Sequence, residues 1–430
     1  MVVIRGALYK KRLMDSLLQE YLEDFPAVLI EGAKDVGKTS TCQEFSKTEY
    51  HLDMREQLSI VQADASILFR QELPVLIDEW QRFPEIWDIV RREVDADLPL
   101  GSVLLTGSSP SLHQGLHSGS GRIERLKMRP FSIEERELAE PVLTIKTLLT
   151  GVALTVSGKT ALTLSDYMDE IYKSGFPGIR VRSERAIKRS LTSYIDNIIE
   201  RDFQENNIIV RKPKALMAWL KTYAAATATT TSFKTILEAA LANENISPST
   251  KTATSYRDLL QNIGIIEELQ PWIKMGKIFS NIAKAPKHFL LDPALSVTLL
   301  NITRETLLAG QPPKVIGTLN KSFLGQIFES FVYQSLAVYA EVNEAELSHF
   351  RTSDGTREID FIIEKDDVIV LIEVKSKSAI TTHDVRHLNW FEEKVKDEFK
   401  VQKIIVTTGS QAYTRQDGVH VVPVALLGAI

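Results

Sequence analysis

A glycine-rich turn near the start of the chain has the residue types and spacing of a phosphate-binding loop. Its residues are Gly32, Ala33, Lys34, Asp35, Val36, Gly37, Lys38 and Thr39, and Ser40 follows directly. Glycines let backbone N–H groups curl around phosphate oxygens. Lys38 adds a positive charge, and the Thr39 hydroxyl can coordinate Mg²⁺. The pattern predicts a site for a nucleoside triphosphate, with ATP and Mg²⁺ as the expected cofactors.

A second apolar run, residues 74–77, ends in the adjacent acids Asp78 and Glu79. Neighbouring side chains on a strand point in opposite directions, so we expect the two acids to have different roles. Asp78 is expected to hold Mg²⁺, and Glu79 to orient the attacking water. The alternative is a pair of surface acids that cap a strand.

Further polar residues are placed to contact the phosphates. The apolar run 102–106 leads to Thr106 and Ser108, either of which is a candidate sensor for the γ-phosphate. Arg122, preferred over Arg125, is a candidate for reaching the nucleotide of a neighbouring subunit. Arg180 is a candidate phosphate sensor because it follows a glycine- and proline-containing break. Solvated basic residues are the alternative for the arginines.

The helices and strands expected around these residues indicate an α/β multidomain protein. The runs 27–30, 74–77 and 102–106 alternate with helices after an expected amphipathic helix over 7–25, which predicts a largely parallel sheet. Expected helices at 167–172 and 184–203 would form a helical lid over the nucleotide.

The next segment reads as a winged helix. Three helices are expected at 214–223, 232–242 and 247–263, followed by a hairpin of strands 265–269 and 288–292. The third helix begins with a cap at 247–249. Residues near its start would face DNA, namely Lys251, Thr252, Thr254, Ser255, Tyr256 and Arg257. The alternative is a module that packs against protein.

A second cluster of acids belongs to the last part of the chain. Expected elements are a helix at 323–339, strands at 347–351, 358–363, 368–375 and 403–407, and a helix at 383–395. Glu373 and Lys375 share one face of their strand, and a turn at 365–367 brings Asp360 beside Glu373. Glu329 can add a carboxylate. Glu329, Asp360 and Glu373 would bind Mg²⁺ or Mn²⁺, and Lys375 would orient the attacking water. A buried ion pair beside strand-edge acids is the alternative.

The whole chain of 430 residues has 44% hydrophobic residues and a formal net charge of -5, which fits several globular domains and excludes a uniformly basic nucleic-acid coat. The expected boundaries are a core at 1–135, a lid at 136–210, a winged-helix-like domain at 211–310 and a final domain at 311–430. One cysteine, Cys42, and no long uncharged run favour a cytoplasmic protein with no membrane association.

These motifs together resemble prokaryotic AAA-type ATPases followed by a domain of unknown function that ends in a PD-(D/E)XK restriction-endonuclease-like fold. The resemblance is carried by residues 32–39, 77–79, 105–109, 175–177, 198–202 and 351–375. It implies a nucleotide site at Lys38, Thr39, Asp78 and Glu79, and a nuclease-like site at Glu329, Asp360, Glu373 and Lys375. The chain departs from the pattern where Thr106 or Ser108 replaces an asparagine, and where no proline–aspartate pair precedes Glu373.

The resemblance implies an ATPase with a nuclease-like tail, related to ring-forming machines that act on DNA. Because both sites occur in one chain, the leading hypothesis is an ATP-hydrolysing homo-oligomer, such as a hexameric ring, that translocates or remodels duplex or branched DNA, with the tail binding or cutting the strand. Two alternatives stay open at this point. One is an ATP-dependent switch for protein docking with an inactive nuclease-like scaffold, and the other is an ATP-regulated, Mg²⁺-dependent nuclease.

Overall fold

The computed structural model describes residues 9–107, 121–205, 208, 210, 212–244, 250–273, 282–310 and 323–430. The sensor candidate Ser108 and the expected cap at 247–249 lie outside the described residues. The chain divides into two compact units, one of Met1–Pro130 with Asn262–Gly264, and the other of Phe131–Gln261 with Ile265–Ile430.

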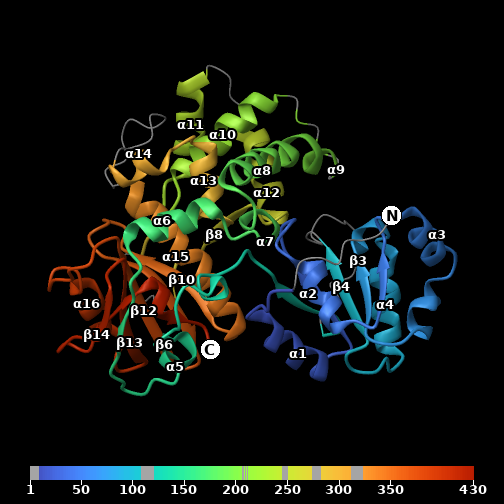
Figure 1. Ribbon diagram of the computed structural model, residues 1–430, viewed down its shortest axis with the longest axis horizontal. Coiled ribbons are helices and arrows are strands. Elements are labelled where there is room, and N and C mark those ends of the chain that lie inside the picture. The colour runs from blue at the N-terminus through green and yellow to red at the C-terminus, as the bar shows by residue number, and fades with distance from the viewer. Residues whose placement is uncertain are drawn as a thin grey trace. The chain divides into compact units, whose positions relative to one another are not determined.

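The first unit is built on a parallel sheet (Figure 1). Its strands are β1 (Ala27–Glu31), β2 (Thr48–His51), β3 (Val75–Asp78), β4 (Val103–Gly107) and β5 (Glu124–Lys127), in the order β2-β3-β4-β1-β5. Every neighbouring pair is parallel, which confirms the predicted sheet. The carboxyl ends of β1, β2, β3 and β4 therefore meet at one edge, where open parallel sheets bind ligands.

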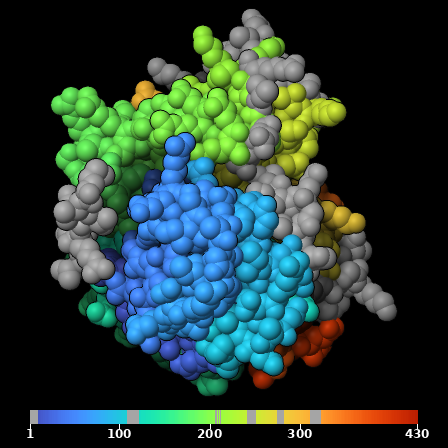
Figure 2. All heavy atoms as spheres, turned by 90° about the vertical axis from the view of Figure 1, so that its right-hand side faces the viewer, coloured from blue at the N-terminus to red at the C-terminus, as the bar shows by residue number. Residues whose placement is uncertain are grey.

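Helices cover both faces of this sheet. They are α1 (Met14–Asp24), α2 (Lys38–Phe45), α3 (Arg55–Ala63) and α4 (Glu85–Asp95). Alternate strand residues, among them Leu29, Ile77 and Leu105, pack with Val61 of α3 and Trp87 of α4 in one buried core. In Figure 2 the blue and cyan atoms of this unit form one continuous body. The expected helix over 7–25 begins later, at Met14.

Helices make up most of residues 164–205 in the second unit, where the sequence predicted helices. The short α5 (Ile145–Leu148) precedes them, and their bounds are α6 (Leu164–Lys173), α7 (Pro177–Arg180), α8 (Glu184–Asn197) and α9 (Phe203–Glu205). A π-helical turn, Ile198–Asp202, joins α8 to α9, so the helix expected over 184–203 is not regular throughout. Pro177 begins α7 where its missing N–H costs nothing.

The middle of this unit has the predicted order of three helices and a hairpin. The helices are α10 (Pro213–Ala225), α11 (Phe233–Glu244) and α12 (Thr250–Asn262). Strands β8 (Ile266–Leu269) and β9 (Lys287–Leu290) pair antiparallel. Two helices follow, α13 (Pro293–Leu299) and α14 (Arg304–Leu308). This order is compatible with the winged-helix prediction.

A mixed sheet completes the second unit. Its strands are β10 (Glu346–Arg351), β11 (Glu358–Lys365), β12 (Val368–Lys375), β13 (Lys400–Thr407), β14 (Gln411–Thr414), β15 (His420–Pro423) and β7 (Ser157–Lys159), in the order β10-β11-β12-β13-β15-β14-β7. The helices α15 (Phe323–Val342) and α16 (Arg386–Val395) contact it. Figure 1 shows α16 beside this sheet. The element order expected for the last domain is thus present.

The expected boundary of the helical lid differs from the structure. Strand β7 pairs with β14, and the short β6 (Leu143–Thr144) pairs with β16 (Leu427–Gly428). Strand β7 therefore completes the edge of the C-terminal sheet, and β6 forms a separate two-stranded sheet with β16, so neither strand belongs to a separate lid over 136–210. Hydrogen bonding to strands more than 250 residues away decides this, and no local pattern carries that information.

Among the described helices, none combines the length and the apolar character needed to cross a lipid bilayer.

Candidate active site

The phosphate loop joins β1 to α2 in the first unit, as the sequence predicts. Gly32 has φ +152° and Gly37 has φ +105°, which are conformations that favour glycine. A Cβ added at Gly32 would lie 2.3 Å from the backbone oxygen of Met128, so no larger residue fits there. Lys34, Asp35 and Val36 form the intervening turn, in which Asp35 has φ +65°.

Lys38 holds the loop in its curled shape. The ammonium of this buried residue donates to the carbonyl of Gly32 at 2.9 Å and to that of Ala33 at 2.8 Å. Burial lowers the pKa of Lys38, while the charges of Glu79 and Asp78 oppose this effect. The loop therefore presents a cation and a close-packed glycine turn, and these residues fit a triphosphate.

Asp78 ends β3 among three polar side chains. Its Oδ1 accepts from the Thr39 hydroxyl at 3.0 Å and from the Thr106 hydroxyl. Burial tends to raise the pKa of Asp78, but hydrogen bonds from His51, Thr106 and Thr39 outweigh it and lower the pKa. A carboxylate kept ionised beside the loop hydroxyl is the donor set expected for Mg²⁺. Thr106, a predicted phosphate sensor, here contacts the carboxylate.

Glu79 leaves the strand in a different direction from Asp78. It has φ +55°, and its Oε2 accepts from Gln81 Nε2 at 2.6 Å. Burial raises the pKa of Glu79, with Lys38 opposing. A Cβ on Gly107 would lie 2.2 Å from Gln81 Oε1, so a glycine at the end of β4 leaves room for the residue that orients Glu79.

His51, which sequence reasoning missed, also belongs to this site. It ends β2 in register with Asp78, and its Nδ1 lies 3.1 Å from Asp78 Oδ2. Its Nε2 lies 3.1 Å from Glu49 Oε2. A polar residue at the carboxyl end of a strand could have indicated a role for His51 in the site. The sequence alone does not show that β2 pairs with β3, so this indication could not be used.

Arg12, also missed, supports the phosphate loop from the N-terminal side. This buried guanidinium donates to the carbonyl of Val36 at 2.9 Å and to that of Arg129 at 2.7 Å. Its backbone N–H donates to Asp15, whose carboxylate also accepts from the Tyr9 hydroxyl at 2.7 Å. The residues before α1 are therefore part of the loop's support.

The two predicted arginines have partners inside their own units. Arg122 pairs with Asp95 at 2.6 Å, and 41% of its side chain is exposed. Arg180 donates to the carbonyl of Ser174 at 2.6 Å and to Glu170 at 2.9 Å. Neither pairing is apparent from the sequence, and the sensing roles of both arginines stay predictions.

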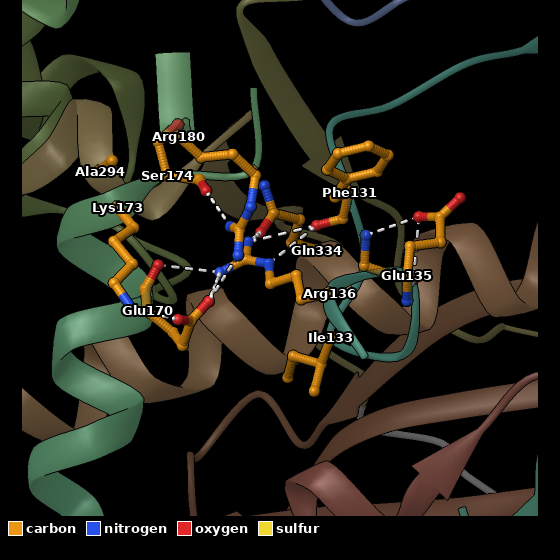
Figure 3. A network of polar contacts seen from close by, with 12 residues as sticks. Phe131, Ile133, Glu135, Arg136, Glu170, Lys173, Ser174, Arg180, Ala294 and Gln334 are labelled. Atoms are coloured by element: carbon orange, nitrogen blue, oxygen red, sulfur yellow. Dashed lines mark hydrogen bonds and ion pairs between the residues drawn. The ribbon is translucent and has the colours of Figure 1, made fainter. Parts of the chain in front are cut away.

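Arg180 is one part of a buried network that Figure 3 shows. Arg136 has no exposed side-chain surface and donates to Gln334 of α15 at 2.7 Å and to the carbonyl of Glu170 at 2.9 Å. It also donates to the carbonyl of Phe131. These hydrogen bonds hold the start of the second unit against α6 and α15. Arg136 and Arg180 therefore have a structural role in this unit.

The nuclease-like residues come together in the second unit. Glu373 Oε2 accepts from Lys375 at 2.6 Å, and Asp360 Oδ2 accepts from the backbone N–H of Val374 at 2.9 Å. Glu329 of α15 instead pairs with Lys287 of β9 at 2.8 Å. Lys287 was not singled out in the sequence because β9 is distant from the acids along the chain.

The Mg²⁺ or Mn²⁺ centre at Glu329, Asp360 and Glu373 stays a prediction. Across the described ranges, no group of three or more His, Cys, Asp or Glu residues is arranged to hold a metal ion. The ammonium of Lys287 lies beside Glu329 and Asp360. The cleavage roles of Asp360, Glu373 and Lys375 stay predictions.

The helix expected to read DNA presents part of the predicted set. Lys251, Thr254 and Ser255 are exposed, whereas Tyr256 is buried. Arg257 pairs with Asp258 at 3.0 Å and lies 4.6 Å from the centre of the Phe233 ring. Arg257 is thus engaged within the unit.

Three segments of the chain match models of known domains. Residues 24–137 match an AAA domain, residues 164–306 match a domain of unknown function (DUF8612), and residues 324–427 match another (DUF4143). The chain therefore contains an AAA-type ATPase domain followed by these two domains.

Two relatives span most of the chain. An uncharacterized protein of Mycobacterium tuberculosis is 25% identical over 387 residues, which are 86% of this chain and 75% of the relative. An uncharacterized protein of Haemophilus influenzae is 22% identical over 355 residues, which are 82% of this chain and 76% of the relative. Similarity over most of the chain thus extends to uncharacterized proteins of these two bacteria.

Two solved structures are similar at a lower level. A Walker-type ATPase of Pyrococcus abyssi covers 69% of this chain and 97% of its own, with 16% identity and a TM-score of 0.42. The Orc1 protein of Aeropyrum pernix in complex with DNA covers 70% of this chain and 95% of its own, with 12% identity and a TM-score of 0.22. At these scores neither structure informs the function of this chain.

Proposed function

We propose that this chain hydrolyses ATP at the loop between β1 and α2. The observation that carries the proposal is the placement of Asp78, whose Oδ1 accepts from the hydroxyls of Thr39 and Thr106. These groups belong to three separate elements of one sheet edge. Lys38 and Glu79, each mostly buried, lie in the same site, as their charge interactions indicate.

Each residue has a distinct part in this reaction. The loop backbone and Lys38 bind and orient the phosphates, while Thr39 and Asp78 would hold Mg²⁺, which when bound neutralises phosphate charge. Glu79 orients the attacking water and accepts its proton. Burial raises the pKa of Glu79 toward the working pH, which favours proton transfer to it.

Two substitutions separate binding from hydrolysis. Lys38→Ala is expected to weaken ATP binding and to lower kcat by about 100-fold or more, because it removes the phosphate-facing cation. Glu79→Gln is expected to bind ATP normally and to lose hydrolysis, since an amide cannot accept the proton. The measurements are calorimetric binding of ATP and the rate of phosphate release.

Exposed residues of α2 and its C-terminal flank provide matched controls. Lys47→Ala and Glu44→Gln make the same chemical changes outside the site and should leave both measurements unchanged. Hydrolysis by Glu79→Gln at the wild-type rate would contradict the assigned role, and unchanged ATP binding by Lys38→Ala would contradict the site.

We further propose that this ATPase forms a homo-oligomer and acts on DNA. The support is the order of α10, α11 and α12 before the β8–β9 hairpin, together with the exposed polar residues Lys251 and Ser255 on α12. Lys251 can contact backbone phosphate, which provides affinity without base readout.

The test compares ATP hydrolysis with and without duplex or branched DNA. DNA is expected to raise the rate, and Lys251→Ala should weaken DNA binding, measured by fluorescence anisotropy. Lys234→Ala is the matched control because Lys234 is an exposed lysine of α11. If no DNA binds or stimulates while ATP is still hydrolysed, the nucleotide-dependent protein switch becomes the better proposal.

A further inference from the structure

Two of the acids predicted to bind a metal in the second unit, Glu329 and Asp360, lie beside the ammonium of Lys287, as does Glu358. This side chain has no exposed surface. Its Nζ lies 2.8 Å from Glu329 Oε1, 3.4 Å from Glu358 Oε1 and 3.5 Å from Asp360 Oδ1. One cation thus interacts with acids from helix α15 and strand β11, and it lies where carboxylate ligands of a metal would converge.

Lys287 keeps its charge in this position. Three carboxylate groups lie within 3.5 Å of its ammonium, and their negative charges offset the cost of burying it. The residue is also fixed at its backbone, because β9 pairs with β8 and Lys287 lies opposite Leu269. The cation is therefore held by the hairpin as well as by the acids.

A divalent metal would have to enter against this charge. A buried ammonium and a metal ion at the same carboxylates repel one another strongly, because little water screens them. Moving the ammonium away would leave it unpaired in the interior, which is costly. The positive charge of Lys287 thus balances the negative charge of the surrounding carboxylates, as a metal ion would otherwise do.

Glu373, the remaining predicted ligand, has one of its two oxygens in an internal ion pair. Its Oε2 is taken by Lys375 at 2.6 Å. Within the described part of the chain, its Oε1 is buried and has no hydrogen-bond partner. A metal ion at Oε2 would therefore have to displace the Lys375 ammonium.

We propose that the nuclease-like centre is a closed ion network in which Lys287 is the resident cation, so that it takes up no divalent metal. This inference disagrees with the metal-dependent nuclease that the resemblance implies. It also gives the hairpin a defined role, since β9 supplies the cation that joins the middle of the unit to α15 and the C-terminal sheet. The inference does not depend on ATP hydrolysis.

The direct test measures Mn²⁺ binding to the full-length chain without nucleotide, by electron paramagnetic resonance. All proteins carry Asp78→Asn, which removes the expected metal ligand of the nucleotide site. With Lys287 present, Asp360→Asn should not change the amount of Mn²⁺ bound. Binding that Asp360→Asn abolishes would overturn the proposal, as would Mg²⁺-dependent DNA cleavage that the same substitution abolishes.

A second comparison tests the role of Lys287 itself. Lys287→Met removes the charge at similar size and should create about one Mn²⁺ site per chain, which added Asp360→Asn should then remove. Lys287→Arg keeps a positive charge and should gain no site. A folded Lys287→Met protein that binds no Mn²⁺ would also overturn the proposal. If Lys287→Met does not fold, the first comparison decides alone.

Discussion

At the scale of the residue, Asp78 depends on side chains that the chain brings from three other strands or loops. Thr39 comes from the phosphate loop, Thr106 from β4 and His51 from β2. The two threonines hydrogen-bond Oδ1 and the histidine contacts Oδ2, so the carboxylate has a fixed orientation. A fixed carboxylate positions a metal ion with less loss of freedom on binding.

His51→Ala should therefore raise the Mg²⁺ concentration needed for half-maximal ATP hydrolysis by about 10-fold or more, because Asp78 loses the partner of its Oδ2. The measurement is the hydrolysis rate as a function of Mg²⁺ at saturating ATP. Glu49→Gln is the control, since it changes the other neighbour of His51 and leaves the contact with Asp78 in place. Equal effects of the two substitutions would argue against a direct role for the His51–Asp78 contact.

The residues that sequence reasoning found and those that it missed differ in a physical way. The residues from Gly32 to Thr39 are adjacent in sequence, so their spacing encodes their geometry. His51 and Lys287 act through partners 27 and 42 residues away, in other strands or helices. Such pairs depend on strand order, and strand order is set by packing of the whole unit.

At the scale of the element, the predicted strands and helices largely match the structure because each has a clear apolar period. The strands at 27–30 and 368–375 and the helix at 323–339 were found with small changes at their ends. Strand β7 was not predicted, because Ser157–Lys159 is a short segment with no buried residue. That strand exists because β14 offers it hydrogen bonds.

Strand β10 carries a buried histidine that should make the second unit sensitive to acid. His349 Nε2 lies 3.2 Å from the carbonyl of Ala285. Burial, helped by the charge of Lys287, lowers the pKa of His349 from 6.5 to about 3. The unfolded chain therefore binds a proton between these pH values and the folded chain does not, so stability falls as pH decreases from 6.5 toward 3.

His349→Gln should flatten this dependence, because glutamine can donate to the same carbonyl and does not titrate in this range. One such histidine changes the free energy of unfolding by up to about 1.4 kcal/mol per pH unit within the window. The measurement is urea denaturation of both proteins at pH values from 7 to 4. His383→Gln is the control, since His383 is exposed. Parallel curves for wild type and His349→Gln would contradict the prediction.

At the scale of the whole molecule, we expect ATP hydrolysis in the proposed oligomer to depend on one arginine, Arg122. Arg122 pairs with Asp95, and both side chains are over 40% exposed, so this ion pair contributes little stability and can exchange for another partner. An arginine supplied to a neighbouring nucleotide typically raises the hydrolysis rate by about 1000-fold or more.

Arg122→Ala should accordingly bind ATP normally and hydrolyse it about 1000-fold more slowly. Mixing Arg122→Ala with Lys38→Ala should restore activity, because a subunit with an intact site then receives Arg122 from a subunit that cannot bind ATP. Phosphate release by the mixture is the measurement, and Arg125→Ala is the control with an exposed arginine in the same segment. No recovery in the mixture would count against donation between subunits.

The pairing of β7 with β14 has a consequence for how this protein can be made and divided. Residues 157–159 are synthesised about 250 residues before β14, so β7 has no strand to pair with until the C-terminal sheet is nearly complete. A fragment that starts at residue 324, where the last domain match begins, would expose β14 and invite pairing with other chains. We expect such a fragment to aggregate and one that starts at Phe131 to stay dispersed.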